Sequence, residues 1–327
     1  MTPSDSAPAV AFEHVVKTYP GGEHAVNDVD LSIPRGSFAV LVGPSGSGKT
    51  TLLKTVNRLY EPTSGRVFVE GADIASVDPV ALRRRIGYVI QNVGLFPHMT
   101  VAANIAVVPS LLGWERARTD ARTDELLALV HLEPDRFRAR YPAQLSGGQA
   151  QRVGLARALA ADPEILLMDE PFGALDAIER DRLQHEMAEL HQRLRKTVLF
   201  VTHDVGEALR LADLLVVMRA GRIEQAGTPL DIITGPANAF VAALLDAEDV
   251  MRRFSVMRVE MAMRRGESPS PATGHRISCD RDLRTALSLM MQAGVSSLLV
   301  VDGSGVPLGA VALADLQRAA RPATSKA

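Results

Sequence analysis

The sequence predicts an α/β fold with a mainly parallel sheet, followed by a smaller C-terminal α/β unit. Three observations predict it. Short apolar, strand-like runs alternate with helical stretches over residues 10–235, a glycine-rich loop joins one such strand to a helix, and a Pro/Ser/Gly-rich segment at 264–274 sets off the end of the chain. A chain of 327 residues is long enough for one large domain and a small second one.

The expected core strands are continuous apolar runs, which suit strands buried on both faces. They are residues 39–42, 165–168, 198–201 and 214–218. Helical patterns such as residues 180–195 lie between them, and this alternation implies a parallel sheet covered on both faces. Near the N-terminus, residues 10–17, 37–42 and 65–69 could instead form an antiparallel layer.

The end of the chain is expected to form a second unit. Residues 236–263 have a helical pattern, and 264–274 are typical of a linker. Beyond it we expect a helix at 283–292, strands at 297–301 and 309–313, and a last helix that includes 316–320. The expected boundaries are therefore 1–235 for the large domain, 236–275 for a connector and linker, and 276–320 for the small unit.

Composition excludes several classes of protein. The formal net charge of −2 argues against a general nucleic-acid binder. Cys279 is the single cysteine, so the chain has no internal disulfide and no cysteine-rich metal site. We find no signal-peptide pattern near the first residue and no apolar run near the ~18 residues that a spanning helix needs. We therefore expect a soluble or peripheral protein that acts on membranes through partners.

A glycine-rich loop predicts phosphate binding. It fits the pattern G-x-x-x-x-G-K-[ST] and consists of Gly43, Pro44, Ser45, Gly46, Ser47, Gly48, Lys49 and Thr50. It follows the strand at 38–42 and opens a helix at Thr51, so backbone N–H groups and the helix N-terminus can face phosphate oxygens. We expect Lys49 to reach the β- and γ-phosphates and Thr50 to ligate Mg²⁺. This loop alone fits a kinase, a GTPase or a transporter ATPase.

Two carboxylates follow the apolar run at 165–168. Such strand ends, at the carboxyl edge of a parallel sheet, are where these folds bind ligands. We expect Asp169 to hold Mg²⁺, directly or through water, and Glu170 to polarise the attacking water.

A second anion-binding helix start decides the family. It is the LSGGQ motif at 145–149, in which Ser146, Gly147, Gly148 and Gln149 open a helix. The motif resembles the signature of the ABC ATPases, which are P-loop NTPases with a mainly parallel core sheet, an antiparallel β layer and a helical subdomain. The resemblance implies ATP and Mg²⁺ as cofactors. It also implies a head-to-tail homodimer in which each signature closes over the ATP of the other chain.

Four further residues resemble functional positions of this family. Tyr19 resembles the aromatic residue that stacks on adenine, and Gln91 the glutamine that contacts Mg²⁺ and the attacking water. Asp176 ends a loop, 173–176, that resembles the one communicating between the two sites. His203 resembles the histidine that contacts the γ-phosphate. Ala150 departs from the family pattern, where a polar residue is frequent, but lies outside the phosphate-contacting positions.

The chain looks most like the ATPases of bacterial importers for osmoprotectants such as glycine betaine, choline and carnitine. Residues 92–105 resemble the region that receives the permease, although this cluster could equally belong to the core. The resemblance implies integral membrane permeases, an extracytoplasmic substrate-binding protein and a place on the cytoplasmic face of the bacterial inner membrane. An importer of another small solute, such as an amino acid or polyamine, and a soluble non-transport ABC ATPase remain alternatives.

The small unit at 276–320 resembles a single CBS module, a type found on ATPases of that importer group. In modules that bind adenosine nucleotides a Ser or Thr stands three residues before an Asp, whereas Ala312 precedes Asp315 here. Residues 258–327 carry nine Arg or Lys against six Asp or Glu, a net charge of +3. This basic tail could contact anionic lipid or could be an ordinary solvated surface.

Overall fold

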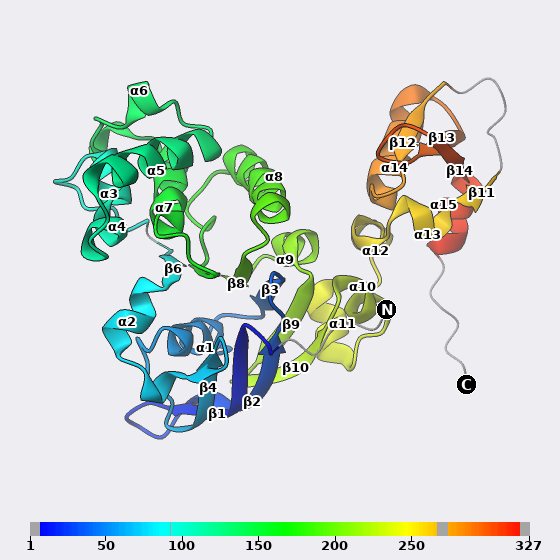
Figure 1. The fold of residues 1–327 in the computed structure, drawn as a ribbon. Coiled ribbons are helices and arrows are strands. Elements are labelled where there is room, and N and C mark those ends of the chain that lie inside the picture. The colour runs from blue at the N-terminus through cyan, green and yellow to red at the C-terminus, as the bar shows by residue number, and fades with distance from the viewer. Residues whose placement is uncertain (1–6, 92, 267–273, 321–327) are drawn as a thin grey trace. The chain divides into compact units, whose positions relative to one another are not determined.

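The computed structural model describes residues 7–91, 93–266 and 274–320. The chain forms two compact units, one ending at Glu224 and one beginning at Gln225. The division falls within β10 (Arg222–Gly227), earlier than the boundary at 235 that the sequence suggested. Each unit has its own sheet and helices (Figure 1).

A six-stranded sheet forms the centre of the first unit, in the order β10-β9-β3-β8-β7-β6. Its other strands are β3 (Phe38–Val42), β6 (Ile86–Val89), β7 (Ile165–Asp169), β8 (Thr197–Thr202) and β9 (Leu214–Arg219). The pairs β9–β3, β3–β8, β8–β7 and β7–β6 are parallel. Every residue of β3, β7 and β8 is buried, which is why these strands read as continuous apolar runs. The predicted parallel sheet is confirmed.

An antiparallel layer in the order β2-β1-β4-β5 packs against this sheet. Its strands are β1 (Val10–Thr18), β2 (His24–Ile33), β4 (Ser64–Val69) and β5 (Ala72–Asp73). The prediction was right for residues 10–17 and 65–69 but wrong for 37–42, which belong to the parallel sheet because all five β3 side chains are buried. The sequence did not predict β2 or the two-residue β5 of this layer; the inward residues of β2 alternate only from Val29 onward.

Helix α1 (Lys49–Val56) contacts strands of both sheets, and its Leu52 and Leu53 join one hydrophobic core with β1, β3 and β8. The other helices around the sheets are α2 (Pro79–Arg84), α8 (Ala177–Leu194), α9 (Val205–Leu211) and the short 3₁₀ helix η1 (Ile74–Ser76). This arrangement places the N-terminus of α1 directly after the buried strand β3.

The chain between β6 and β7 forms the expected helical subdomain, which gathers to one side of the sheet (Figure 1). Its elements are α3 (Val101–Ile105), α4 (Val107–Leu111), α5 (Arg116–Leu129), α6 (Pro134–Phe137), η2 (Pro142–Gln144) and α7 (Gly147–Leu159). Among the residues that the structure describes, no helix is long and apolar enough to cross a bilayer.

The second unit begins with α10 (Pro229–Thr234), α11 (Ala239–Leu245), α12 (Val250–Val256) and α13 (Val259–Ala262). A four-stranded sheet follows in the order β11-β14-β13-β12, formed by β11 (Arg264–Arg265), β12 (Arg276–Ser278), β13 (Ser297–Val301) and β14 (Pro307–Ala312), with α14 (Leu283–Ala293) and α15 (Leu313–Ala319).

Part of the expected linker is structured. Arg264 and Arg265 form β11 and pair with Ala310 and Gly309 of β14, while residues 267–273 lie outside the described residues. Phe254 and Val259 from the expected connector are buried in the same core as the sheet and α14. The connector and the small module therefore share one hydrophobic core.

Candidate functional site

The phosphate loop needs glycine at two positions for steric reasons. A Cβ on Gly43 would lie 2.2 Å from the carbonyl oxygen of Met218, and one on Gly48 would lie 2.1 Å from that of Ala25. Gly48 also has a positive φ of 98°. Gly46 has φ 78° but nothing within 4 Å of a Cβ, so there the requirement is conformational. The loop is thus held against β9 and β2 by close backbone contacts.

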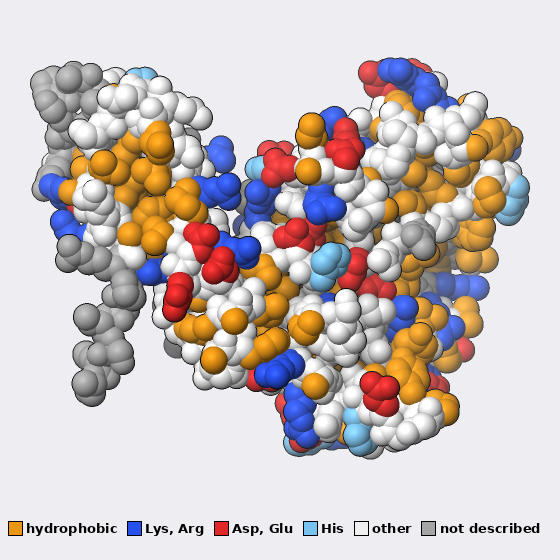
Figure 2. All heavy atoms as spheres, turned by 180° about the vertical axis from the view of Figure 1, so that it is seen from behind, with side chains coloured by type: hydrophobic (Ala, Val, Ile, Leu, Met, Phe, Trp, Pro, Cys, Tyr) orange, Lys and Arg blue, Asp and Glu red, His pale blue; other side chains and the backbone are white. Residues whose placement is uncertain are grey.

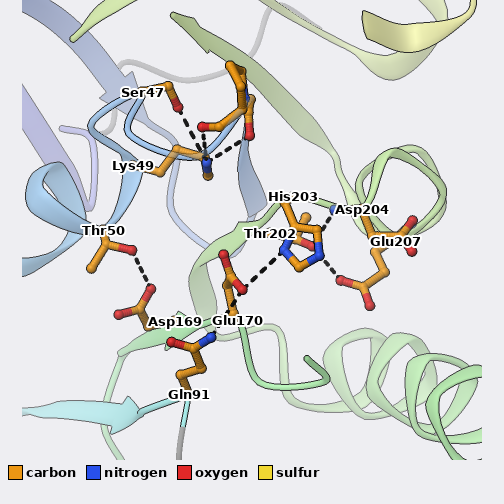
Figure 3. Close-up of polar contacts among 12 residues, drawn as sticks. Ser47, Lys49, Thr50, Gln91, Asp169, Glu170, Thr202, His203, Asp204 and Glu207 are labelled. Carbon is orange, nitrogen blue, oxygen red and sulfur yellow. Dashed lines mark hydrogen bonds and ion pairs between the residues drawn. The ribbon is translucent and has the colours of Figure 1, made fainter. Parts of the chain in front are cut away.

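Lys49 lies inside this loop. Its ammonium donates to the carbonyl oxygens of Gly43 at 2.8 Å and Pro44 at 2.9 Å, and to Ser47 Oγ at 3.3 Å (Figure 3). The residue is only 6% exposed. An ammonium group whose partners are mostly neutral carbonyls at the start of a helix can bind an anionic ligand.

Thr50 and Asp169 come together from α1 and β7. The Thr50 hydroxyl donates to Asp169 Oδ1 at 2.7 Å, and Lys54 Nζ lies 3.8 Å from Asp169 Oδ2. Asp169 is buried. A hydroxyl and a carboxylate oxygen at this separation form the hard oxygen donor set that Mg²⁺ prefers, so these residues fit a magnesium ion.

Glu170 joins the two other polar residues expected near the reaction. Gln91 Nε2 donates to Glu170 Oε2 at 3.3 Å, and His203 Nδ1 lies 3.1 Å from the same oxygen (Figure 3). The Glu170 N–H donates to the carbonyl of Val201 at 2.9 Å, which fixes the residue at the sheet edge with φ 45°. The structure therefore brings Gln91, Glu170 and His203 to one place.

The sequence analysis did not single out Glu207, a buried carboxylate behind His203. It accepts hydrogen bonds from Thr202 on β8 and from Gln184 on α8. An acidic residue in the first turn of a short helix is common, so the sequence offered only a weak signal.

Tyr19 follows β1 and lies beside α1. Its hydroxyl is 3.4 Å from Thr51 Oγ1, and its ring meets the ring of Tyr60 edge-on at 6.0 Å between centroids. Lys17 Nζ lies 5.8 Å from the centre of the Tyr19 ring. The half-buried ring is thus placed next to the helix that the phosphate loop opens.

The signature residues cap α7. Ser146 Oγ accepts the N–H of Gln149, and Gln149 Oε1 accepts the N–H of Ser146, at 3.3 and 3.0 Å. Gly147 is exposed, and a Cβ on Gly148 would lie 2.9 Å from Glu179 Oε2 of α8. Ala150 follows in the first turn of α7, outside this capping arrangement.

Asp176 caps the neighbouring helix, α8. Its Oδ1 accepts the N–H groups of Ile178 and Glu179, both at 3.0 Å. Ser146 and Asp176 therefore each begin a helix whose N-terminus offers positive potential.

A groove of about 340 Å³ lies near the loop that follows Gln91. Its lining includes Arg83, Arg84, Phe96, Val107 and Arg157. Hydrophobic side chains also gather over α3 and α4, at the right edge of Figure 2. Of the expected interface at 92–105, Asn92 lies outside the described residues.

Arg157 connects this groove to α7. Its guanidinium donates to the carbonyls of Val93 and Gly94 at 2.9 and 2.7 Å, and burial lowers its pKa. Arg157 stands near the C-terminal end of α7, so the 93–94 loop and the signature lie at opposite ends of the same helix.

Both carboxylate oxygens of Asp315, in the C-terminal unit, already accept hydrogen bonds from the same chain. It is buried, accepts the N–H of Ala312 at 2.9 Å, and accepts Arg264 Nε at 2.9 Å, with Arg318 at 3.5 Å. Burial raises the pKa of Asp315, but the hydrogen bonds from Arg264 and Ala312 outweigh it and leave the pKa below 3.8. This carboxylate is occupied by its own chain.

Comparison with known proteins identifies the family. The family model described as "ABC transporter" matches residues 26–173. The glycine betaine/carnitine/choline transport ATP-binding protein OpuCA of Bacillus subtilis is 51% identical over 301 residues, which cover 92% of this chain and 77% of the relative. The glycine betaine uptake system ATP-binding protein YehX of Escherichia coli is 50% identical over 308 residues, 94% of this chain and 98% of the relative.

Solved structures agree with the sequences. A dimeric post-hydrolysis ATP-binding cassette bound to ADP and phosphate superposes with a TM-score of 0.60 and 35% identity, covering 67% of this chain and 98% of that one. The predicted fold and family are therefore confirmed, and the chain belongs to the ABC transporter ATP-binding proteins and is an ATPase of that family.

Proposed function

We propose that this chain hydrolyses ATP to energise an importer of quaternary-amine osmoprotectants of the glycine betaine, choline and carnitine type. The observation that carries the proposal is the identity of about half of all aligned residues to ATP-binding proteins named for these three solutes. The Lys49–Asp169–Glu170 arrangement supports an active ATPase. An importer of another small solute, such as an amino acid or polyamine, is the alternative, because this subunit does not itself select the substrate.

Nucleotide binding is assigned to the phosphate loop and α1. Residues 43–51 surround the phosphates, with Lys49 moving from the Gly43 and Pro44 carbonyls to phosphate oxygens. Tyr19 stacks on adenine at the side of α1. Thr50, Asp169 and Gln91 would hold Mg²⁺, which supplies positive charge against the phosphates when bound.

Hydrolysis is assigned to the three residues that meet at Glu170. The Glu170 carboxylate orients the attacking water and accepts its proton. Gln91 and His203, both within hydrogen-bonding distance of Glu170 Oε2, hold that carboxylate until nucleotide binds. His203 then contacts the γ-phosphate, and its 61% exposed side chain is free enough to do so.

The complete site requires a second copy of this chain. Ser146, Gly147, Gly148 and Gln149 supply a second anion-binding helix start, which we assign to the ATP held by the partner. Asp176 lies at the N-terminus of α8. Glu179 of the same helix lies close to Gly148 of the signature, so Asp176 would connect the two sites. Two solved ATP-binding cassette structures that resemble this chain are described as dimeric.

We further propose that a permease binds the groove beside Phe96 and Arg157 at the cytoplasmic face of the membrane, with an extracytoplasmic binding protein delivering the solute. Arg157 would pass movement of the 93–94 loop to α7. If the chain were instead a soluble, non-transport ABC ATPase, it would not sediment with membranes in cell fractionation.

For the C-terminal unit we propose a CBS-like module that binds no nucleotide, because Arg264 occupies Asp315. Its basic surface would contact anionic lipid and respond to salt. The test replaces four exposed arginines with glutamine: Arg265, Arg276, Arg281 and Arg284. We expect the salt dependence of uptake to be lost while ATPase activity remains, and an unchanged salt response would refute the lipid contact.

Glu170→Gln tests the assigned chemistry. The variant keeps the hydrogen-bonding shape but cannot accept a proton, so we expect normal ATP binding, a fall in turnover of roughly 100-fold or more, and accumulation of ATP-bound dimers. ATP hydrolysis and size-exclusion chromatography measure the two effects. Glu189→Gln, an exposed residue on α8, is the control. Normal turnover in Glu170→Gln would remove the residue from this role.

A further inference from the structure

Glu207 occupies an unusual position for a carboxylate. It lies in the first turn of α9 and is only 5% exposed. Both of its carboxylate oxygens accept hydrogen bonds: Oε2 from the Thr202 hydroxyl at 2.6 Å, and Oε1 from Gln184 Nε2 at 3.0 Å. A buried charge is costly unless its hydrogen bonds are made, so these two donors stabilise Glu207 where it stands.

Hydrogen bonds among Thr202, Asp204 and Glu207 connect Glu207 to the turn that carries His203 (Figure 3). The Thr202 hydroxyl, which donates to Glu207, also accepts the N–H of Asp204 at 2.9 Å. Asp204 Oδ1 in turn accepts the N–H of Glu207 at 3.1 Å. Thr202 and Asp204, which flank His203, are therefore joined with Glu207 in one hydrogen-bond network.

His203 itself has much less support. The His203 side chain is 61% exposed. Among the described residues, its imidazole makes one hydrogen bond, to Glu170 Oε2. The direction of the imidazole consequently depends on the backbone of the turn. A turn that relaxes by about 1 Å can cost roughly 100-fold in rate, because catalytic groups act only in a narrow range of geometries.

The same carboxylate reaches the helix that Asp176 caps. Gln184 stands on α8, and Asp176 accepts the first N–H groups of that helix. The Glu207–Gln184 hydrogen bond thus ties the His203 turn to α8. Burial raises the pKa of Glu207, and the hydrogen bonds from Thr202 and Gln184 act against that rise.

We propose that Glu207 is a positioning residue for ATP hydrolysis, which holds the 202–204 turn so that His203 faces Glu170 and the γ-phosphate. This inference rests on the proposed function, because it acts through His203. Both Glu207 carboxylate oxygens are bonded to Thr202 and Gln184, so in this proposal Glu207 acts through the turn and not on the nucleotide itself. Its loss should therefore lower kcat and leave ATP binding, which the phosphate loop provides, almost unchanged.

The experiment compares Glu207→Ala with Glu207→Gln in the full-length chain. Alanine removes both acceptors. Because loss of one hydrogen bond to a charged group shifts an equilibrium by about tenfold, we expect kcat to fall by about tenfold or more. The KM for ATP should change by less than about twofold, since the phosphate loop is untouched. Glutamine can still accept from Thr202 and donate to Gln184 once the Gln184 amide is turned. We therefore expect Glu207→Gln to recover activity to within about threefold of wild type.

A double mutant separates positioning from general destabilisation. In a His203→Ala background, Glu207→Ala should lower kcat by less than about twofold, because two residues that act through one group are not additive. A full, multiplicative loss would overturn the inference, as would a Glu207→Ala enzyme with wild-type kcat. If Glu207→Ala does not fold, Thr202→Val removes the same link and is expected to give the same loss of kcat; wild-type turnover in that variant also overturns it.

Two controls keep this test independent of the proposed function. Glu189→Ala removes an exposed carboxylate from α8 and should leave kcat unchanged. Glu170→Gln, measured in the same assay, tests the proposed chemistry itself. If Glu170→Gln loses turnover and Glu207→Ala does not, only the positioning inference fails; if Glu170→Gln turns over normally, the proposed function fails first.

Discussion

Replacing Lys49 by methionine separates binding of ATP from stability of the loop. The substitution keeps the length of the side chain but removes an ammonium that donates to Gly43 and Pro44 carbonyl oxygens and to Ser47 Oγ. The buried Gly43 carbonyl then loses a donor at a cost of roughly 1–3 kcal/mol, whereas water can replace the donor at the exposed Pro44. The variant also no longer has to bury a charge, and this gain has the opposite sign.

Burying the Lys49 ammonium opposes its charged form, and the pKa of Lys49 is lowered accordingly. Burial lowers it, and the attraction of Glu170 and Asp169 does not restore the ordinary value of 10.5. Because a lowered lysine pKa means that the unfolded chain binds more protons, the stability of wild type relative to the variant should rise with pH between the folded pKa and 10.5. At neutral pH the two opposing terms should leave the free energy of unfolding within about 2 kcal/mol of wild type.

ATP affinity should respond much more strongly. Loss of one partner from a buried charged hydrogen bond costs roughly 2–5 kcal/mol, or about 30-fold or more in Kd. Fluorescence titration with a nucleotide analogue gives Kd, and urea unfolding gives stability. The control, Lys196→Met, breaks ion pairs with Asp162 and Glu164 and should not alter Kd. A change in Kd below about threefold in Lys49→Met would refute the role of the ammonium.

Three other substitutions test local geometry and one buried ion pair. Gly48→Ala should lower the free energy of unfolding by more than about 2 kcal/mol and abolish ATP binding, because its Cβ would overlap the Ala25 carbonyl; Gly46→Ala, with open space around its Cβ, should cost only about 1 kcal/mol. Thermal unfolding compares the pair, and equal costs would contradict the steric argument. Arg264→Met should destabilise the C-terminal unit by about 1–2 kcal/mol near neutral pH. In wild type the ionised Asp315 stabilises the fold, and this stability is lost as the pH falls below 3.8. Arg264→Met removes one cause of the lowered Asp315 pKa, so the variant should lose less stability over the same pH range. Acid titration monitored by circular dichroism measures this, and identical curves would contradict the role of the pair.

Features that depend on neighbouring residues could be predicted from the sequence. The runs that form β3, β7 and β8 are fully buried, so their apolar character alone identified them. Three functional motifs are contiguous in sequence: the phosphate loop, the acidic pair at 169–170 and the signature. Their residue types and order were therefore enough to predict their chemistry. The roles assigned to these residues remain predictions until the variants are measured.

Features that depend on contacts between distant segments could not be predicted. The apolar alternation of β2 is interrupted at Asp28, whose φ of 56° marks an irregular pairing with β1. Arg264 looked like part of a linker because its partner, Asp315, lies 51 residues away. The hydrogen bond that ties Glu207 to α8 likewise comes from a distant residue, Gln184, which stands 23 residues earlier on another helix.

Uptake of labelled solute tests the central claim most directly. Cells that lack this gene would be complemented with wild type or Glu170→Gln, and uptake of glycine betaine, choline and carnitine measured at low and high salt. We expect wild type to restore uptake of at least one of these solutes and Glu170→Gln to restore none. Equal uptake of all three with and without the gene would contradict the assignment to quaternary-amine import.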